Sequence, residues 1–199
     1  MGINLQKGQT ISLAKEAPGL SKVIMGLGWD IKKKSTPGGF FSKLFSAADA
    51  DVDLDAACLM LNQSGKLEFM VYYSNLKSPD GSIVHSGDNL TGEGEGDDEQ
   101  IIVDLKSVPR NINKLVFAVT IFQAKDRKQD FGQVENAFVR MVNASNNNEI
   151  ARYSLSSGYP GMTSMILAEV YRENDEWRMS AVGEGSQVDS LHKLSERYK

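Results

Sequence analysis

The run from Gly87 to Glu99 carries the clearest chemistry in the chain. Six carboxylates fall between Asp88 and Glu99, and glycine occupies every second position through the middle of the run. Carboxylates this dense repel one another unless a cation lies among them, and glycines let the backbone fold closely around something small. Oxygen ligands on a flexible loop suit a hard cation such as Ca²⁺, which takes about 6–8 oxygens. The run therefore predicts an acidic metal-binding loop.

A second acidic cluster alternates aspartate with other residues, at Asp49, Asp51, Asp53 and Asp55. On an extended chain this alternation puts the four carboxylates on one side, spaced by about 6.5–7 Å, and turns Ala50, Val52 and Leu54 toward a core. For this cluster alone, a solvated acidic loop is the favoured interpretation, and metal binding is the alternative. The two clusters together supply more oxygen donors than one Ca²⁺ needs, so we expect one or two ions where the loops meet.

Several better-known ion and phosphate motifs do not match these clusters. An EF-hand that starts at Asp51 would need glycine where Ala56 stands and glutamate where Asn62 stands. A phosphate-binding loop needs Gly-Lys-Ser/Thr after its glycines, and this run has acids there. Cys58 falls in an expected core strand, which argues against zinc or copper, whereas Mg²⁺ stays an alternative to Ca²⁺.

Composition narrows the class of protein. The chain has 199 residues and a formal net charge of −4, which argues against general nucleic-acid binding because that relies on a basic face. One cysteine excludes an internal disulfide and fits a reducing compartment. The first residues lack the pattern of a signal peptide, and the longest apolar stretch, 115–122, is too short to span a bilayer. The expected location is the cytoplasm.

Short strands separated by turns dominate the pattern and predict an all-β fold. We expect a β-sandwich of two mainly antiparallel sheets, forming a single domain over residues 1–199. A helical turn is expected at Ser107–Pro109, and a short amphipathic helix at about 187–198, capped by Ser186. The expected strands lie at 3–5, 10–13, 22–29, 56–61, 67–73, 101–105, 115–122, 138–143, 149–155, 165–171 and 176–182, with His85 in a further strand.

The segment 32–48 differs from its surroundings and is expected to be an inserted loop. Three lysines and a Pro-Gly-Gly turn lead into an apolar tip formed by Phe40, Phe41, Leu44 and Phe45. Because these side chains are costly to leave in water, we expect them to contact something. Packing back onto the sandwich is the favoured interpretation, and contact with a partner protein or a peripheral membrane surface is the alternative.

These residues resemble the TerD family of tellurium-resistance proteins. The resemblance is carried by Gly26–Asp30, Asp53–Ala56, Leu76–Gly81, Gly87–Glu99, Phe131–Val134, Ala137–Arg140 and Glu149–Tyr153, and it covers roughly residues 3 to 185. The insertion at 32–48 is similar to that of TerZ-type members, which carry a glycine- and phenylalanine-rich segment at this place.

The resemblance implies a Ca²⁺-binding β-sandwich that works with other products of a bacterial stress operon linked to tellurite resistance. It implies no known catalytic activity. By position, the family's metal ligands fall on Asp30, Asp53, Asp55, Asp88, Asn89, Gly92, Glu93, Glu95, Asp97, Asp98 and Glu99. Gly92 would contribute through its backbone carbonyl, and the insertion after Asp30 could displace that residue from the site.

The residues themselves favour a binding or scaffold protein over an enzyme. The two histidines, His85 and His192, belong to no recognisable triad motif, and the chain has no Gly-x-Ser-x-Gly. A metal-dependent hydrolase with an open Ca²⁺ or Mg²⁺ site is the enzyme alternative, and it would need a metal that is not fully surrounded by carboxylates.

Overall fold

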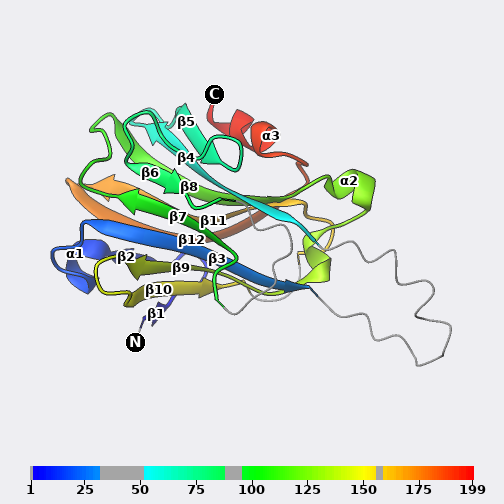
Figure 1. The fold of residues 1–199 in the computed structure, drawn as a ribbon, viewed down its shortest axis with the longest axis horizontal. Helices are drawn as coiled ribbons and strands as arrows, with labels where there is room; N and C mark the ends of the chain where they lie inside the picture. The colour runs from blue at the N-terminus through cyan, green and yellow to red at the C-terminus, as the bar shows by residue number, and fades with distance from the viewer. Residues whose placement is uncertain (1, 32–51, 88–95, 156–158) are drawn as a thin grey trace.

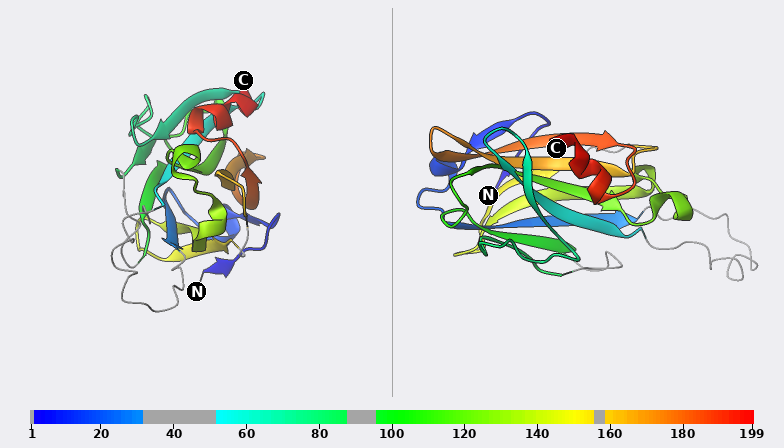
Figure 2. Two further views of the ribbon diagram at one scale, coloured as in Figure 1. Left: turned by 90° about the vertical axis from the view of Figure 1, so that its right-hand side faces the viewer. Right: turned by 90° about the horizontal axis from the view of Figure 1, so that it is seen from above.

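Segments with alternating apolar residues form two six-stranded sheets that pack face to face (Figures 1 and 2). The structure is a computed structural model that describes residues 2–31, 52–87, 96–155 and 159–199. All strand pairs in both sheets are antiparallel, except that β1 runs parallel to β10. The expected all-β sandwich of two mainly antiparallel sheets is confirmed.

Each sheet is named here after one of its central strands. The β3 sheet has the order β1 (Ile3–Asn4), β10 (Glu149–Ser154), β9 (Val134–Asn143), β3 (Lys22–Ile31), β7 (Glu99–Asp104) and β6 (Ile83–His85). The β4 sheet has the order β2 (Thr10–Ser12), β12 (Glu176–Ser186), β11 (Ser164–Glu173), β8 (Ile112–Ile121), β4 (Leu54–Asn62) and β5 (Leu67–Tyr72).

Short helices close the ends and one outer face of the sandwich. They are α1 (Leu13–Glu16), α2 (Ala124–Arg127), the 3₁₀ turn η3 (Phe131–Gln133), α3 (Leu191–Ser195) and the 3₁₀ turn η4 (Glu196–Tyr198). Among the described residues, no helix has the length and apolar character needed to cross a membrane.

Strand β4 is buried on both faces because the sandwich has a core on each side of it. Ala56, Cys58 and Met60 pack between the two sheets, whereas Leu59 packs on the other side of β4 against Leu194 of α3. This arrangement explains why β4 reads as an almost continuous apolar run rather than a strict alternation.

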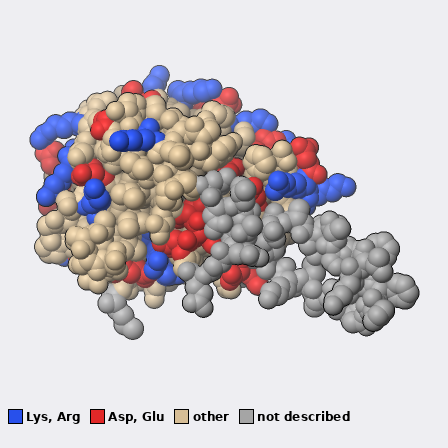
Figure 3. Space-filling view, viewed as in Figure 1, with Lys and Arg blue, Asp and Glu red and all other residues tan. Residues whose placement is uncertain are grey.

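The strands that carry or adjoin the predicted acids meet at one end of the sandwich. Here β3 ends at Ile31, and β4 and β7 begin at Leu54 and Glu99; we call this the acidic end (Figure 1, right). The space-filling view shows Asp and Glu side chains grouped in the middle of this face, toward that end (Figure 3).

Two helix predictions differ from the structure. Residues 105–108 form turns, with Ser107 and Val108 both donating to the carbonyl of Asp104, and no helix follows because Pro109 has no N–H to continue such a series. The C-terminal helix is present, but it begins at Leu191 because β12 continues to Ser186. Its cap is Ser190, whose Oγ accepts from Lys193 N at 3.3 Å, so the expected cap at Ser186 is wrong.

Candidate metal-binding site

Glu99 inserts a carboxylate between the two sheets at the acidic end. It pairs with Leu27 of β3, and its Oε2 accepts a 2.7 Å hydrogen bond from the backbone N–H of Ala56 on β4. Strand β5 pairs with β4 only as far as Ala57, so the N–H of Ala56 lies beyond that ladder. Glu99 therefore links the two sheets where the pairing of β4 with β5 ends.

His85 lies against this buried carboxylate. Its Nε2 is 3.7 Å from Oε2 of Glu99, and both side chains are 0% exposed. The backbone N–H of Gly87 donates to Nδ1 of His85 at 3.1 Å, so in the neutral ring the proton sits on Nε2 and faces Glu99. His85 thus contacts Glu99 from β6, the strand that precedes the acidic run.

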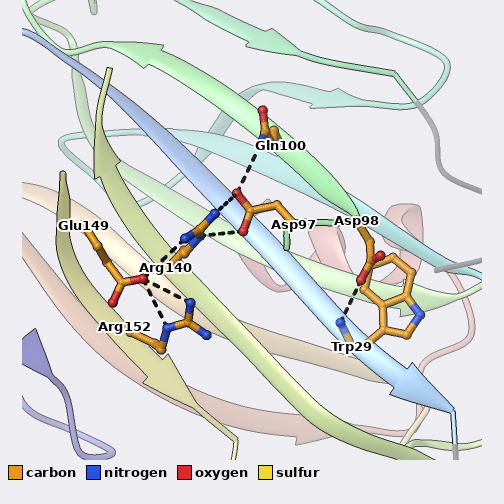
Figure 4. Close-up of polar contacts among 7 residues, drawn as sticks. All are labelled: Trp29, Asp97, Asp98, Gln100, Arg140, Glu149 and Arg152. Atoms are coloured by element: carbon orange, nitrogen blue, oxygen red, sulfur yellow. Dashed lines mark hydrogen bonds and ion pairs between the residues drawn. The ribbon is translucent and has the colours of Figure 1, made fainter. Parts of the chain in front are cut away.

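Asp98 lies beside Trp29 at the edge of β3. Its Oδ2 accepts from the backbone N–H of Trp29 at 2.8 Å, and its own N–H donates to the carbonyl of Leu27 at 2.7 Å (Figure 4). Burial raises the pKa of Asp98 above the ordinary aspartate value. The N–H of Trp29 opposes this rise, and the negative charges of Asp30 and Asp97 add to it. The site therefore holds Asp98 in surroundings that disfavour its charged form.

Asp97 is held on the outer face of the β3 sheet by Arg140 of β9. Arg140 Nε and Nη2 donate to its two oxygens at 2.7 and 3.1 Å, and Gln100 Nε2 donates at 3.1 Å (Figure 4). The side chain is 1% exposed, and its carboxylate lies over Gly26, where a Cβ would collide with it. The Asp97 carboxylate therefore occupies space that is open because Gly26 has no side chain.

The Asp97–Arg140 pair continues into a wider charged network. Arg140 Nη1 lies 3.5 Å from Glu149, and Arg152 donates to the same carboxylate oxygen at 3.1 and 3.2 Å (Figure 4). The guanidinium of Arg152 also lies 4.0 Å from the centroid of the Phe138 ring. The hydrogen bond that Arg140 donates to Asp97 is the largest of the effects that raise the pKa of Arg140. This network thus connects the end of the acidic run to β9 and β10.

Asp30 is exposed at the end of β3. Its Oδ2 accepts from Asn136 Nδ2 of β9 at 2.8 Å, next to a shift in register between Gly28 and Asp30. The structure places it close enough to Asp98 for their charges to interact.

Asp53 and Asp55 lie on the side of β4 opposite the inter-sheet core. Val52 and Leu54 are buried in that core, which confirms the predicted alternation over these residues. Asp53 is 7% exposed and lies 3.9 Å from Arg127 Nη1, and Asp55 is 6% exposed and borders a cleft beside α2. The two aspartates therefore approach the acidic end from the β4 sheet.

The structure thus brings the sequence-predicted acids of the described chain into three places. Asp30, Asp97 and Asp98 lie on the β3 sheet, Glu99 lies between the sheets, and Asp53 and Asp55 lie on β4. In residues 2–31, 52–87, 96–155 and 159–199, no group of three or more His, Cys, Asp or Glu side chains is arranged to hold a metal ion. The remaining predicted residues, Asp88, Asn89, Gly92, Glu93, Glu95, Phe40, Phe41, Leu44 and Phe45, lie outside the described residues.

The donor chemistry of the described acids nevertheless fits Ca²⁺. Asp98 is desolvated beside two other carboxylates, so a bound cation would relieve their repulsion. Cys58 is not a metal ligand of this kind, because burial in the core raises the pKa of its thiol and keeps it protonated. Oxygen donors without a thiolate are the ligands that hard cations prefer.

Sequence reasoning did not find the residues that hold the acids in place. Gln100 and Asn136 belong to strands and carry no motif of their own. Arg140 stood in the Ala137–Arg140 segment of the resemblance without an assigned role, and it is 43 residues from Asp97 along the chain. The available signal was the pair Gly26 and Gly28 inside an apolar strand, because glycine there indicates a close approach by another group.

Comparisons with known proteins agree with this fold. The family model described as "TerD domain" matches residues 1–198. The chain is 50% identical to "Stress response protein SCP2" of Bacillus subtilis (strain 168), with 100% of each chain covered. It is 44% identical to "Tellurium resistance protein TerD" of Serratia marcescens, covering 93% of this chain and 91% of that protein. It is 41% identical to the TerZ protein of the same organism, covering 96% and 95%.

A solved structure shares the architecture. The structure of a homologue of telluride resistance protein (TerD), SCO6318 from Streptomyces coelicolor A3(2), has a TM-score of 0.67 with 21% identity, covering 91% of this chain and 99% of that one. At this identity the match shows the fold alone. The family match and the curated relatives show more: the chain belongs to the TerD family.

Proposed function

We propose that the protein is a non-enzymatic Ca²⁺-binding module of a bacterial stress and tellurite-resistance system. In this proposal it works in the cytoplasm as a calcium-dependent interaction or scaffold protein with other products of a stress operon. The curated relatives named for stress response and tellurium resistance support the system to which it is assigned. The calcium proposal depends on the chain's own acids.

The observation that carries it is the environment of Asp98. This carboxylate is partly buried, and it lies beside Asp30 and Asp97, so its pKa is raised. A bound cation would offset the repulsion among these carboxylates. A cation that binds only the folded state also stabilises that state. The neighbouring Glu99 adds a second buried carboxylate at the base of the same segment.

We assign the ligand and anchoring roles to different acids. Asp98, Glu99 and Asp30 would hold the ion from the β3 sheet, with Asp53 and Asp55 from β4 and the predicted donors of 88–95. Asp97 already accepts three side-chain hydrogen bonds, so its role is to anchor the acidic run to Arg140. When bound, Ca²⁺ would supply positive charge that fixes these carboxylates in one arrangement.

The burial of Glu99 supports the non-enzymatic interpretation. Metal-assisted hydrolysis needs a metal with a position open to water and substrate. Among the assigned ligands, the Glu99 side chain is enclosed between the sheets and bonded to the backbone of β4. A ligand held in this way favours a structural role for the ion.

Calorimetric titration of Ca²⁺ into chelator-treated protein tests the proposal, with Mg²⁺ and Zn²⁺ titrated for comparison. We expect saturable, Ca²⁺-selective binding of one or two ions. Asp98→Asn should weaken it by about tenfold or more, because the variant removes a ligand charge. Asp104→Asn is the matched control, since Asp104 lies at the other end of β7. Equal affinity in the wild-type and Asp98→Asn proteins would remove Asp98 from the site.

The Phe40–Phe45 segment remains a second prediction about partners. Replacing Phe40, Phe41 and Phe45 by Ser should weaken co-sedimentation with a partner protein or with liposomes and leave the melting temperature unchanged. A large drop in melting temperature would show that the segment belongs to the core.

A further inference from the structure

A cleft lies on the outer face of the β4 sheet, and Asp55 is the one described residue of its lining that the proposed metal site also uses. The cleft has a volume of about 330 Å³ and lies between α2 and the start of α3. Figure 2 shows these two helices one above the other at the end of the molecule where α2 lies. A volume near 300 Å³ is at the small end of the range for sites that bind small molecules, and it is too small for a folded partner.

One wall of the cleft is aromatic. The ring of Tyr72 packs edge-on against Tyr73, with centroids 5.2 Å apart, and also against His192 of α3, at 5.7 Å. Tyr72 ends β5, so these contacts attach the C-terminal helix to the edge of the sheet. Three rings therefore border one cavity, and Tyr73 is 40% exposed.

The floor of the cleft is polar and buried. Asp55 and Thr120 are paired residues on β4 and β8, and they are 6% and 2% exposed. Both line the cleft. A carboxylate beside a hydroxyl at the bottom of an aromatic-walled cavity is suited to an ammonium group, which donates several hydrogen bonds and carries positive charge.

The charged side chains that line the cleft are mostly negative. Three aspartates and one lysine line the cleft. That lysine, Lys125, is held by Asp189 at 2.7 Å, and Lys193 binds the same carboxylate at 2.6 Å. These two lysines keep the pKa of Asp189 well below its ordinary value. Lys125 and Asp189 thus compensate each other's charge. The other charged residues described in the lining, Asp55 and Asp126, are both acidic, so the lining favours cations over anions.

We propose that this cleft binds a small organic cation with amino groups on a short alkyl chain. The ammonium group would bind Asp55 and Thr120, and the alkyl chain would lie against Tyr72, Tyr73 and His192. Aromatic faces attract cations and also cover apolar carbon, so this wall suits both parts of such a molecule. The site lies beyond the proposed calcium function, although Asp55 borders both.

Titration calorimetry with putrescine, in a chelating buffer, tests this inference on the full chain. We expect saturable binding to one site and none with 1,4-butanediol, which has the same length but no charge. Tyr73→Leu and His192→Leu should each weaken putrescine binding by about tenfold. Leu76→Ala is the control, because Leu76 is exposed, lies after the turn at Tyr73 and Ser74, and does not line the cleft.

The calcium titration of the same variants separates the two proposals. Tyr73→Leu and His192→Leu should bind Ca²⁺ as the wild-type protein does, since neither residue is an assigned calcium ligand. Absence of saturable putrescine binding to folded wild-type protein would overturn the cleft proposal and leave the calcium proposal untouched. Equal losses in Leu76→Ala and Tyr73→Leu would also overturn it, because binding would then not depend on the aromatic wall.

Discussion

At the scale of single residues, three consecutive acids take three different places. Asp97 lies on the outer face of the β3 sheet, Asp98 lies beside β3 just before β7 begins, and Glu99 lies between the sheets. The chain bends at Gly96 and Asp98, so the alternation of an extended strand does not hold there. Identical charges in one short run can therefore serve as an anchor, a candidate ligand and a link between sheets.

The Asp97 anchor depends on the missing side chain at Gly26. Gly26→Ala places a methyl group where the Asp97 carboxylate lies, so we expect a loss of about 1–3 kcal/mol in the free energy of unfolding. Asp97→Ala should also lower the free energy of unfolding by about 1–3 kcal/mol, because it leaves these two donors of Arg140 without their acceptor. Urea denaturation measures both.

The double variant tests whether the two losses have one cause. With the carboxylate gone, the methyl group has room, so Gly26→Ala with Asp97→Ala should cost less than the two single changes added together, by at least about 0.5 kcal/mol. Strict additivity would mean that the methyl group disturbs something other than Asp97.

The raised pKa of Asp98 predicts an unusual pH dependence without metal. A carboxyl group that is harder to ionise in the folded state holds its proton more tightly there than in the unfolded chain, so its contribution to stability falls as pH rises. The loss begins at the ordinary aspartate pKa and is complete above the raised value. In a chelating buffer, Asp98→Asn should remove this loss and be more stable than wild type at neutral pH.

Urea unfolding across pH 4 to 8 in the absence of divalent ions checks this expectation. Asp104→Asn again serves as control, because Asp104 lies at the opposite end of β7. If wild type and Asp98→Asn show the same pH profile, Asp98 is not the source of electrostatic strain at the acidic end.

At the scale of elements, α3 completes the second core. Leu191 and Leu194 pack on the outer side of β4 against residues such as Leu59 and Ile166. An isolated helix of five residues is not stable in water, so this packing must hold α3 in place. The helix also carries His192 to the aromatic wall of the cleft.

Leu194→Ala tests how much α3 contributes. Leu194 is almost fully buried, so we expect a loss of about 2–5 kcal/mol in the free energy of unfolding. Glu196→Ala, an exposed position in the adjoining turn, should change stability by less than about 0.5 kcal/mol. Similar small changes in both variants would show that the terminal helix is not integral to the fold.

Elements were predictable from sequence where local pattern decides them. Val52 and Leu54 alternate with the aspartates, and this alternation gave the correct faces of β4. Helices α1 and α2 have four residues each, too few for helical periodicity, and Gln123 and Lys128 enclose α2 in left-handed conformations that their residue types do not favour. The expected start of the C-terminal helix failed because pairing of β12 with β11 extends to Ser186.

At the scale of the whole molecule, the sandwich gathers acids from distant parts of the sequence at one end. The sequence predicted that two acidic clusters would meet, and the structure places β4 and β7 in contact at the acidic end through Glu99 and Ala56. It did not predict that Asp97 would pair with Arg140, because side-chain partners between strands depend on register, which short-range pattern does not determine. The fold was thus more predictable than the partners within the site.

The central claim is that a metal ion binds beside Asp98, and Trp29 provides a direct test of it. Terbium replaces Ca²⁺ at oxygen sites and emits when a nearby tryptophan is excited. Trp29 lies next to Asp98 (Figure 4). Trp177, the other tryptophan, donates its indole N–H to the carbonyl of Leu105, which follows the far end of β7. The two tryptophans therefore report on different parts of the molecule.

The measurement is terbium emission from chelator-treated protein excited at the tryptophan band. We predict saturable emission that Ca²⁺ competes away, that Trp29→Phe abolishes and that Trp177→Phe leaves in place. Emission that survives in Trp29→Phe, or no emission from folded wild-type protein, would contradict a metal site at the acidic end.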